Sequence, residues 1–196
     1  MYVEVKSSNG VTLVPMETVH LSKRRIFIQG TITMETACAF ADQVMLLNDR
    51  STAEAIDVII TSVGGEVQAG LMMYDVVQTS AAPIRMFCRG MAYSMAAVLF
   101  ASGNHGRYIL PNSKLMLHEP LLGNAVLGNV SSIRALSEEL TDIRNQLNHL
   151  LAKHTGRSME QIETACAYDH YFTPQECVDF GLADEVAGLD KLIGGK

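Results

Sequence analysis

The strongest constraint on the fold is the order in which short apolar runs and amphipathic stretches follow one another. Four apolar runs have the length of buried strands, at residues 25–30, 55–62, 84–88 and 114–118. Stretches with helical spacing or small residues lie between them, at residues 33–48, 66–80 and 94–102. This alternation predicts an α/β fold of repeated βαβ units, in which helices cover the faces of a mostly parallel sheet.

The first two predicted helices carry a clear apolar face. Thr33 is placed to cap the first of them, because threonine at a helix start accepts a hydrogen bond from a free backbone N–H. The apolar residues that share a face are Ala37, Phe40, Ala41, Val44 and Leu47 in the first helix, and Val67, Leu71, Tyr74 and Val77 in the second. Both faces are expected to pack on the sheet.

A long helix is predicted at residues 131–154. Its apolar residues recur at alternating steps of three and four, at Ile133, Leu136, Leu140, Ile143, Leu147 and Leu150. Such a narrow stripe is typical of a seam against another helix, although an amphipathic helix on its own core also carries one. Only 18% of the residues are charged, against about 25% in an average soluble domain. We therefore favour burial of the stripe between subunits over a monomer with a well-filled core.

Composition excludes several classes of function. The net charge is −6, and the longest basic run is Lys23–Arg25, whereas phosphate binding needs clustered cations. No apolar run approaches the roughly 18 residues of a membrane span, and the first residues lack the apolar core of a secretion signal. The four cysteines form no CxxC pair and are expected to be reduced core residues. We expect one cytoplasmic domain, residues 21–196, preceded by an arm at residues 1–20.

Two consecutive strand ends carry unusual chemistry. Gly64 and Gly65 follow the second strand, and Ser94 follows the third at the start of a helix. Ligands in parallel sheets bind at the carboxyl ends of strands, and both glycine pairs and helix starts expose unpaired N–H groups. A hydroxyl beside such donors suits acyl transfer, which needs a nucleophile and a cradle for an oxyanion. Singly, the serine is more often a helix cap and the glycine pair a turn, and GxSxG is absent.

A nucleophilic serine also needs a base, and six histidines are available. His118 is the best placed, because it ends a short strand at the active edge of the sheet. His149 and His154 are expected to face solvent on the long helix, and the remaining histidines are His20, His105 and His170. For the carboxylate that orients the base, spacing leaves three candidates open, Asp142, Asp169 and Asp179.

Three motifs in the expected order resemble the proteolytic subunit family of the Clp protease. They are GMAYSMAAVLFASG around Ser94, LPNSKLMLHEP around His118 and YDHYFTPQECVDFGLADEV around Asp169. The likeness covers roughly residues 21–186 and implies a ClpP/crotonase-like fold with a protruding handle helix. It also implies a Ser94–His118–Asp169 triad, an oxyanion hole from the N–H groups of Gly65 and Met95, and a serine endopeptidase without metal or cofactor. The residues it places along the substrate backbone are Gly64, Leu121, Leu122 and Gly123.

The same resemblance implies an assembly. Members stack two heptameric rings into a tetradecamer around a chamber, join the rings through the handle helix, and receive unfolded protein from an AAA+ unfoldase. The chain departs from the family pattern at several positions, which are Asp57, Ile59, Val63, Tyr93, Glu119 and Tyr168. Tyr168 replaces an arginine that pairs across the ring junction. Asp57 and Ile59 replace aromatic residues of the unfoldase groove, which weakens the prediction of that partner.

Two other functions compete with the peptidase. A non-catalytic ring subunit or scaffold would keep the fold while partnering an active relative. An enzyme like enoyl-CoA hydratase would share the crossover topology and the glycine oxyanion hole, but it has little use for a serine–histidine pair. The serine peptidase is the prediction that uses all three motifs.

Overall fold

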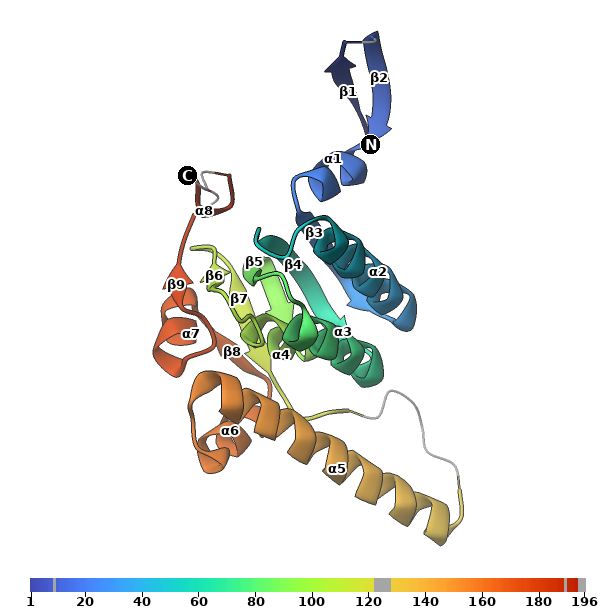
Figure 1. Ribbon diagram of the computed structural model, residues 1–196. Coiled ribbons are helices and arrows are strands. Elements are labelled where there is room, and N and C mark those ends of the chain that lie inside the picture. The colour runs from blue at the N-terminus through green and yellow to red at the C-terminus, as the bar shows by residue number, and fades with distance from the viewer. Residues whose placement is uncertain (9, 122–127, 189, 194–196) are drawn as a thin grey trace.

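A parallel sheet forms the centre of the computed structural model, which describes residues 1–8, 10–121, 128–188 and 190–193 (Figure 1). Its strands run in the order β3-β4-β5-β6-β9, and β7 pairs with β5 while β8 pairs with β7. The bounds are β3 Arg25–Ile32, β4 Ile56–Gly65, β5 Ile84–Tyr93, β6 Arg107–Ile109, β7 Lys114–Leu117, β8 His170–Phe172 and β9 Glu185–Val186. Only β8 runs antiparallel to its neighbour. The α/β fold with a mostly parallel sheet is confirmed.

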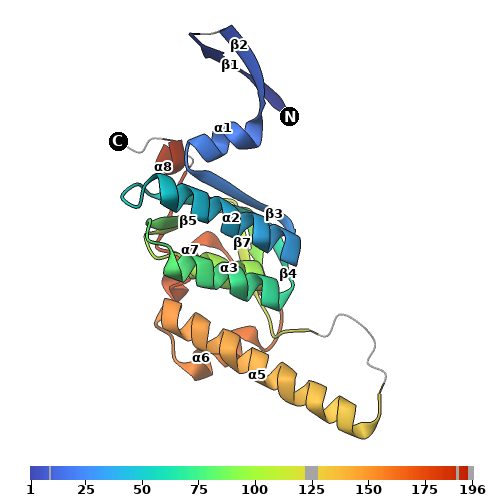
Figure 2. The same cartoon turned by 45° about the vertical axis from the view of Figure 1, so that its right-hand side comes forward.

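Helices α2 (Met34–Arg50) and α3 (Val67–Thr79) lie side by side along one face of the sheet (Figures 1 and 2). Thr33 caps α2 in a reciprocal arrangement with Thr36. The buried residues of α2 are the five predicted ones, Ala37, Phe40, Ala41, Val44 and Leu47. In α3 the buried face is instead Ala69, Gly70, Met73, Tyr74 and Val77. Val67 and Leu71 are only partly buried against the core. Gly70 instead faces the wholly buried helix α4 (Met95–Ala101), where an added Cβ would lie 2.2 Å from Met95 Cγ.

Strand β5 reaches farther than its sequence indicated. The apolar run predicted a strand at residues 84–88, but β5 continues past Gly90 to Tyr93. It pairs with β6 through Met86–Cys88 and then with β7 through Met91–Tyr93. The Gly90 N–H donates to Ser113 Oγ at 2.7 Å where the strand changes partner. This change of partner brings the end of β5 beside the end of β7.

The long helix α5 (Val130–Thr155) extends away from the sheet (Figure 1). Gly156 ends it in the left-handed conformation. Its carboxyl-terminal half packs on the core through Leu147, Asn148 and Leu151. Its amino-terminal half does not, since Ile133 is 49% exposed. The predicted stripe thus divides into an end buried in its own subunit and an end where Ile133 is exposed and Leu136 and Leu140 are half-buried in the described chain.

The remaining elements flank the sheet at its two ends. A hairpin of β1 (Tyr2–Ser7) and β2 (Gly10–Pro15) leads into α1 (Met16–Ser22) and stands apart from the sheet in both views (Figures 1 and 2). After α5 come α6 Met159–Cys166, α7 Pro174–Phe180 and α8 Asp190–Ile193. Helix α7 contacts β7, β8 and β9, so it fixes the strand that follows Asp169 against the sheet.

Candidate active site

Ser94 lies at the junction between β5 and α4 in a strained backbone conformation. Its φ and ψ are 53° and −126°, and only Arg24 shares a positive φ among the described non-glycine residues. Such a conformation costs about 1–3 kcal/mol and persists only where its surroundings enforce it. The Ser94 N–H donates to Met116 O at 2.8 Å, and Ser94 O accepts from the Ala97 N–H at 2.9 Å. These bonds present the hydroxyl at the edge of the sheet.

His118 lies within reach of this hydroxyl. The residue directly follows β7, whose Met116 is paired with Tyr93 of β5, so two parallel strands deliver both residues to the same edge. His118 Nε2 lies 2.8 Å from Ser94 Oγ. This distance suits proton transfer from a nucleophile to a general base. Only 14% of the imidazole side chain is exposed, which limits competition from water.

Asp169 lies on the other side of the imidazole. It precedes β8, and the β7–β8 register pairs Leu117 with His170. Asp169 Oδ1 lies 3.7 Å from His118 Nδ1, and its side chain is 60% exposed. The separation is longer than a hydrogen bond, but the carboxylate faces the nitrogen opposite the one that meets Ser94.

The other candidate carboxylates and two of the other histidines lie in different surroundings. Asp142 is exposed on α5, and Asp179 accepts a hydrogen bond from Gln175 on α7. His149 is exposed, as predicted. The prediction for His154 was wrong, since its Nε2 lies 3.0 Å from the Tyr74 hydroxyl. Burial, with Lys153 and Arg107 nearby, lowers the pKa of His154 to about 4, so it is a neutral packing residue.

The glycine pair lies close against the serine. A Cβ on Gly64 would lie 2.7 Å from Tyr93 O and 2.8 Å from Ser94 Cβ. A Cβ on Gly65 would lie 2.1 Å from Ile32 O, and the φ angles of the two glycines are 91° and 155°. Both positions therefore require glycine. The same atom on Gly64 would be 3.1 Å from Met95 N, so the two backbone segments that carry the predicted oxyanion donors run side by side.

Helix α4 adds electrostatic support at the same point. Met95 is its first residue, and the first N–H groups of a helix have no partner within the helix.

Among the residues that sequence reasoning placed along the substrate, Leu121 is 74% exposed. Leu122 and Gly123 lie outside the described residues.

A small cavity of about 30 Å³ adjoins the serine and the histidine. The other residues that line it are Val67, Met95, Val98, Leu117, Pro120, Leu147, Asn148, Leu151 and Cys166. Sequence reasoning missed most of this lining, because it is assembled from segments far apart in the chain. The stripe on the long helix contained Leu147, but it was interpreted as a subunit contact.

The cavity holds one other potential nucleophile, the thiol of Cys166. Burial, with a smaller effect of Glu119, raises its pKa to about 11. Because the thiolate is the reactive form, this thiol is inert at neutral pH. Burial likewise raises the pKa of Cys88 and Cys177 to about 12. Among the described residues, no group of three or more histidine, cysteine, aspartate or glutamate side chains is arranged to hold a metal ion.

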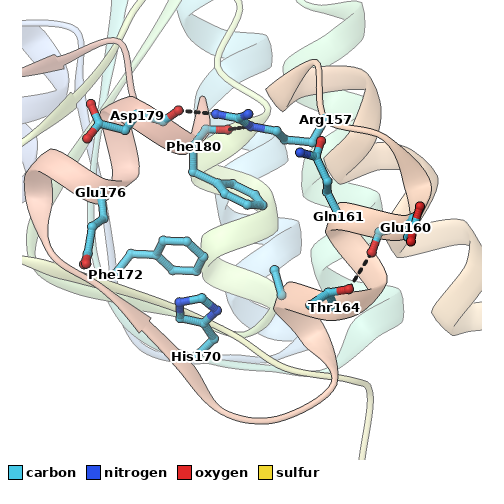
Figure 3. A pocket seen from close by; sticks show the side chains of 10 residues that line it. Arg157, Glu160, Gln161, Thr164, His170, Phe172, Glu176, Asp179 and Phe180 are labelled. Atoms are coloured by element: carbon cyan, nitrogen blue, oxygen red, sulfur yellow. Dashed lines mark hydrogen bonds between the residues drawn. The ribbon is translucent and has the colours of Figure 1, made fainter.

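A larger cavity of about 680 Å³ lies between α6, β8 and α7 (Figure 3). Phe172 and Phe180 form its floor, with ring centroids 5.1 Å apart, and His170 stacks on Phe172 at 4.2 Å. Arg157 donates to the backbone carbonyls of Asp179 and Phe180 (Figure 3). Neither Ser94 nor His118 lines this cavity, so its size does not make it the reaction site.

Comparison with known families agrees with the motifs. The family model described as Clp protease matches residues 10–190, which include every strand of the central sheet and all three candidate triad residues. In the described part of the chain, no helix combines the length and apolar character that crossing a membrane requires.

Proposed function

The chain belongs to the Clp protease family, and on this premise we propose that it is a serine endopeptidase whose catalytic residues are Ser94, His118 and Asp169. The observation that carries the proposal is the 2.8 Å separation of Ser94 Oγ and His118 Nε2. Two parallel strand ends fix this separation, so it does not depend on a surface side chain. Its substrates are peptides and unfolded proteins.

The proposed reaction uses Ser94 as nucleophile and His118 as general base. His118 takes the proton of Ser94 as the hydroxyl oxygen attacks a peptide carbonyl carbon, and a tetrahedral oxyanion forms. The N–H groups of Gly65 and Met95 stabilise that oxyanion. His118 then protonates the leaving amine, which departs as the acyl-enzyme forms. Water, deprotonated by His118, hydrolyses the ester and restores Ser94.

Asp169 has the role of positioning His118. A carboxylate at Nδ1 holds the imidazole in the tautomer that leaves Nε2 free to accept a proton, and it stabilises the imidazolium that follows. Closing the gap of 3.7 Å to hydrogen-bond length requires a movement of about 1 Å. Active-site hydrogen bonds of this kind often tighten only when substrate binds.

A second candidate, a non-catalytic ring subunit, is favoured by one observation. The carboxylate that should orient the base is 60% exposed and stands 3.7 Å away, as in a triad that has lost its alignment. The hydratase-like alternative has no comparable support, because it gives no role to the serine–histidine pair.

Labelling with a fluorophosphonate distinguishes the peptidase from the scaffold. The reagent reacts with a serine only when a base activates it and donors receive the oxyanion. We expect label on the peptide that contains Ser94, and none in Ser94→Ala. Ser132→Ala, which removes an exposed hydroxyl on α5, serves as the matched control and should label normally. Absence of label on assembled wild-type protein would transfer the assignment to the scaffold.

We also propose the assembly in which this reaction takes place. The amino-terminal half of α5 carries apolar side chains without cover in the described chain, including Ile133 at 49% exposure. Packing of this half against its counterpart would join two heptameric rings into a closed chamber. Leu140→Asp should halve the particle mass in light scattering, because a buried carboxylate opposes the contact. Ser131→Asp adds the same charge off the stripe and should leave the mass unchanged.

Delivery of folded proteins by an AAA+ unfoldase is the last part of the proposal. Ile59 is buried at 1% exposure, and Asp57 accepts a hydrogen bond from Arg85 Nε at 2.6 Å. Neither residue offers an exposed apolar docking surface, so an unfoldase must use other residues. The proposal predicts that the isolated protein cleaves short peptides without ATP and leaves stably folded proteins intact.

A further inference from the structure

The strand that leads to the glycine pair carries a buried hydroxyl, that of Ser62, which has no part in the reaction described above. Ser62 lies on β4 and is 1% exposed. Its Oγ donates to Gly30 O on β3 at 2.6 Å and accepts from the Gly64 N–H at 3.1 Å. One side chain therefore joins the first glycine of the pair to the neighbouring strand.

This bridge spans an irregularity in the pairing of β3 with β4. The register pairs Gly30 with Ser62 but Thr31 with Gly64, so that Val63 is passed over. A bulge of this kind interrupts the ladder of backbone hydrogen bonds. Because a buried backbone N–H such as that of Gly64 needs a partner, the hydroxyl of Ser62 replaces a ladder bond at the bulge.

The bridge lies directly before the N–H group to which the proposed mechanism assigns the oxyanion. The Gly64 N–H is bonded to Ser62, and the next N–H along the chain is that of Gly65. Beyond the pair, the Glu66 N–H donates to Ile32 O on β3 at 2.9 Å. The two glycines are thus held at both ends, by the Ser62 hydroxyl before them and by Ile32 after them.

Holding both ends is important because glycine adopts positive and negative φ about equally readily. The direction of the Gly65 N–H depends on the dihedral angles of Gly64 and Gly65, whose φ values are 91° and 155°. Without the Ser62 hydroxyl, the Gly64 end is free to rotate. An oxyanion donor stabilises the transition state only when it points at the oxygen from hydrogen-bond distance.

We propose that Ser62 is a positioning residue, whose hydroxyl fixes the glycine pair so that the Gly65 N–H points at the oxyanion. This inference rests on the proposed peptidase function. Ser62 acts through Gly64 and not on the substrate itself. Because the oxyanion exists only during the reaction, loss of this support should lower kcat and leave KM nearly unchanged.

The test compares Ser62→Ala with Ser102→Ala on a short fluorogenic peptide. Ser102 is 0% exposed, and its hydroxyl donates to Leu99 O at the far end of α4, so the control removes an equally buried hydroxyl. Rates are expressed per Ser94 that a fluorophosphonate labels at completion, so that inactive protein is not counted. Ser62→Ala should lower kcat by about 10- to 100-fold, less than loss of a whole donor costs, with KM within about twofold. Ser102→Ala should keep the wild-type values.

Two further measurements separate positioning from a general loosening of the core. In a peptide boronate, Ser94 Oγ bonds to boron and a boron-bound oxygen occupies the oxyanion position. Its inhibition constant should rise in Ser62→Ala about as much as kcat falls, and should not change in Ser102→Ala. Ser62→Thr keeps a hydroxyl at the same place and should recover kcat to within about threefold of the wild type.

The outcomes for Ser62 and for the peptidase function are distinguishable. A kcat of Ser62→Ala within twofold of the wild type overturns the inference and leaves the peptidase proposal standing. An unchanged boronate inhibition constant, or an equal loss of kcat in Ser102→Ala, does the same. Absence of label on Ser94 of the wild type would remove the peptidase proposal, and the role of Ser62 with it.

Discussion

The nucleophile side and the carboxylate side of the candidate site are built differently. Ser94 and His118 follow strands β5 and β7 of the central sheet, and their reacting atoms lie 2.8 Å apart. Asp169 precedes β8, a strand of three residues, and lies 3.7 Å from the imidazole with most of its side chain exposed. Parallel pairing in the core holds the first pair, whereas a short antiparallel strand at the rim holds the third residue.

This difference shows which parts of the site one subunit can fix by itself. The positive φ of Ser94 is enforced by bonds to Met116 and Ala97, and α4 behind it is completely buried. One link from β8 to the nucleophile strand is an edge contact, in which the rings of Tyr93 and Tyr171 lie 5.6 Å apart. We therefore expect the alignment of Asp169 to respond to substrate or neighbouring subunits, while the Ser94–His118 pair stays constant.

The largest expected effect comes from removing the imidazole itself and, separately, its carboxylate partner. His118→Ala should lower kcat by about 10⁴-fold or more, because the hydroxyl loses its base. Asp169→Asn should lower kcat by about 10²-fold, less than a well-aligned carboxylate would cost. Peptidase rates on one short fluorogenic peptide measure both, with assembly checked by light scattering. Near-normal activity of Asp169→Asn would exclude that residue as the third member.

The glycine pair tests the rigidity of the nucleophile side. Gly64→Ala puts a methyl group 2.7 Å from Tyr93 O and 2.8 Å from Ser94 Cβ, so the serine must shift. A displacement of about 1 Å can cost about 10²-fold in rate. We expect a loss of kcat with little change in KM, measured on the folded, assembled fraction. Gly156→Ala is a useful control, since that glycine also has a positive φ but nothing lies within 4 Å of the added atom.

The aromatic contact tests the carboxylate side. Tyr171→Ala removes the ring that packs on Tyr93 and should loosen β8. We expect roughly a tenfold fall in kcat, because Asp169 then holds the imidazole less often. Tyr168→Ala removes a ring of the same size that is 86% exposed, and its rate should match the wild type. Equal rates for both variants would show that the rim strand is held without this contact.

The smallest expected effect is on the pH dependence of stability, through the lowered pKa of His154. His154 has its pKa lowered to about 4 by burial, whereas an unfolded histidine titrates near 6.5. Between these values the unfolded chain binds a proton that the folded chain does not, so stability falls as pH drops from about 6.5 to 4. His154→Gln should reduce the fall in Tm between pH 7.5 and pH 5. His149→Gln, at an exposed position, should show the wild-type fall; identical curves for both variants would falsify this role.

Local patterns allowed much of the fold to be predicted. Helix α2 was predicted with its cap and its buried face, because Thr33 and the spacing of its apolar residues are properties of neighbouring positions. The extent of β5 beyond Gly90 was not predictable, since it depends on pairing with β7, about 25 residues later in the chain. The contact of half-buried His154 with Tyr74 was missed for the same reason, because the two residues are 80 positions apart.

The candidate site, too, could be predicted from the sequence only in part. The residue types at positions 64, 65, 94 and 118 suggested acyl transfer, because bare N–H groups beside a serine and a histidine supply an oxyanion cradle, a nucleophile and a base. The choice among Asp142, Asp169 and Asp179 needed the family motif, and the structure then placed Asp169 beside the imidazole. No sequence pattern predicted the cavity lined by Asn148, since its walls come from five separate segments.

The sequence alone determined the alternation of strands and helices, the long helix and the candidate reactive groups, because periodicity and residue chemistry are local properties. Only the tertiary structure decided which atoms meet. The 2.8 Å contact of Ser94 with His118, the 3.7 Å separation of Asp169 from His118 and the cavity beside Ser94 and His118 all depend on strand register and helix packing. These are set by contacts between residues far apart in the chain, and single-sequence patterns do not encode such distances.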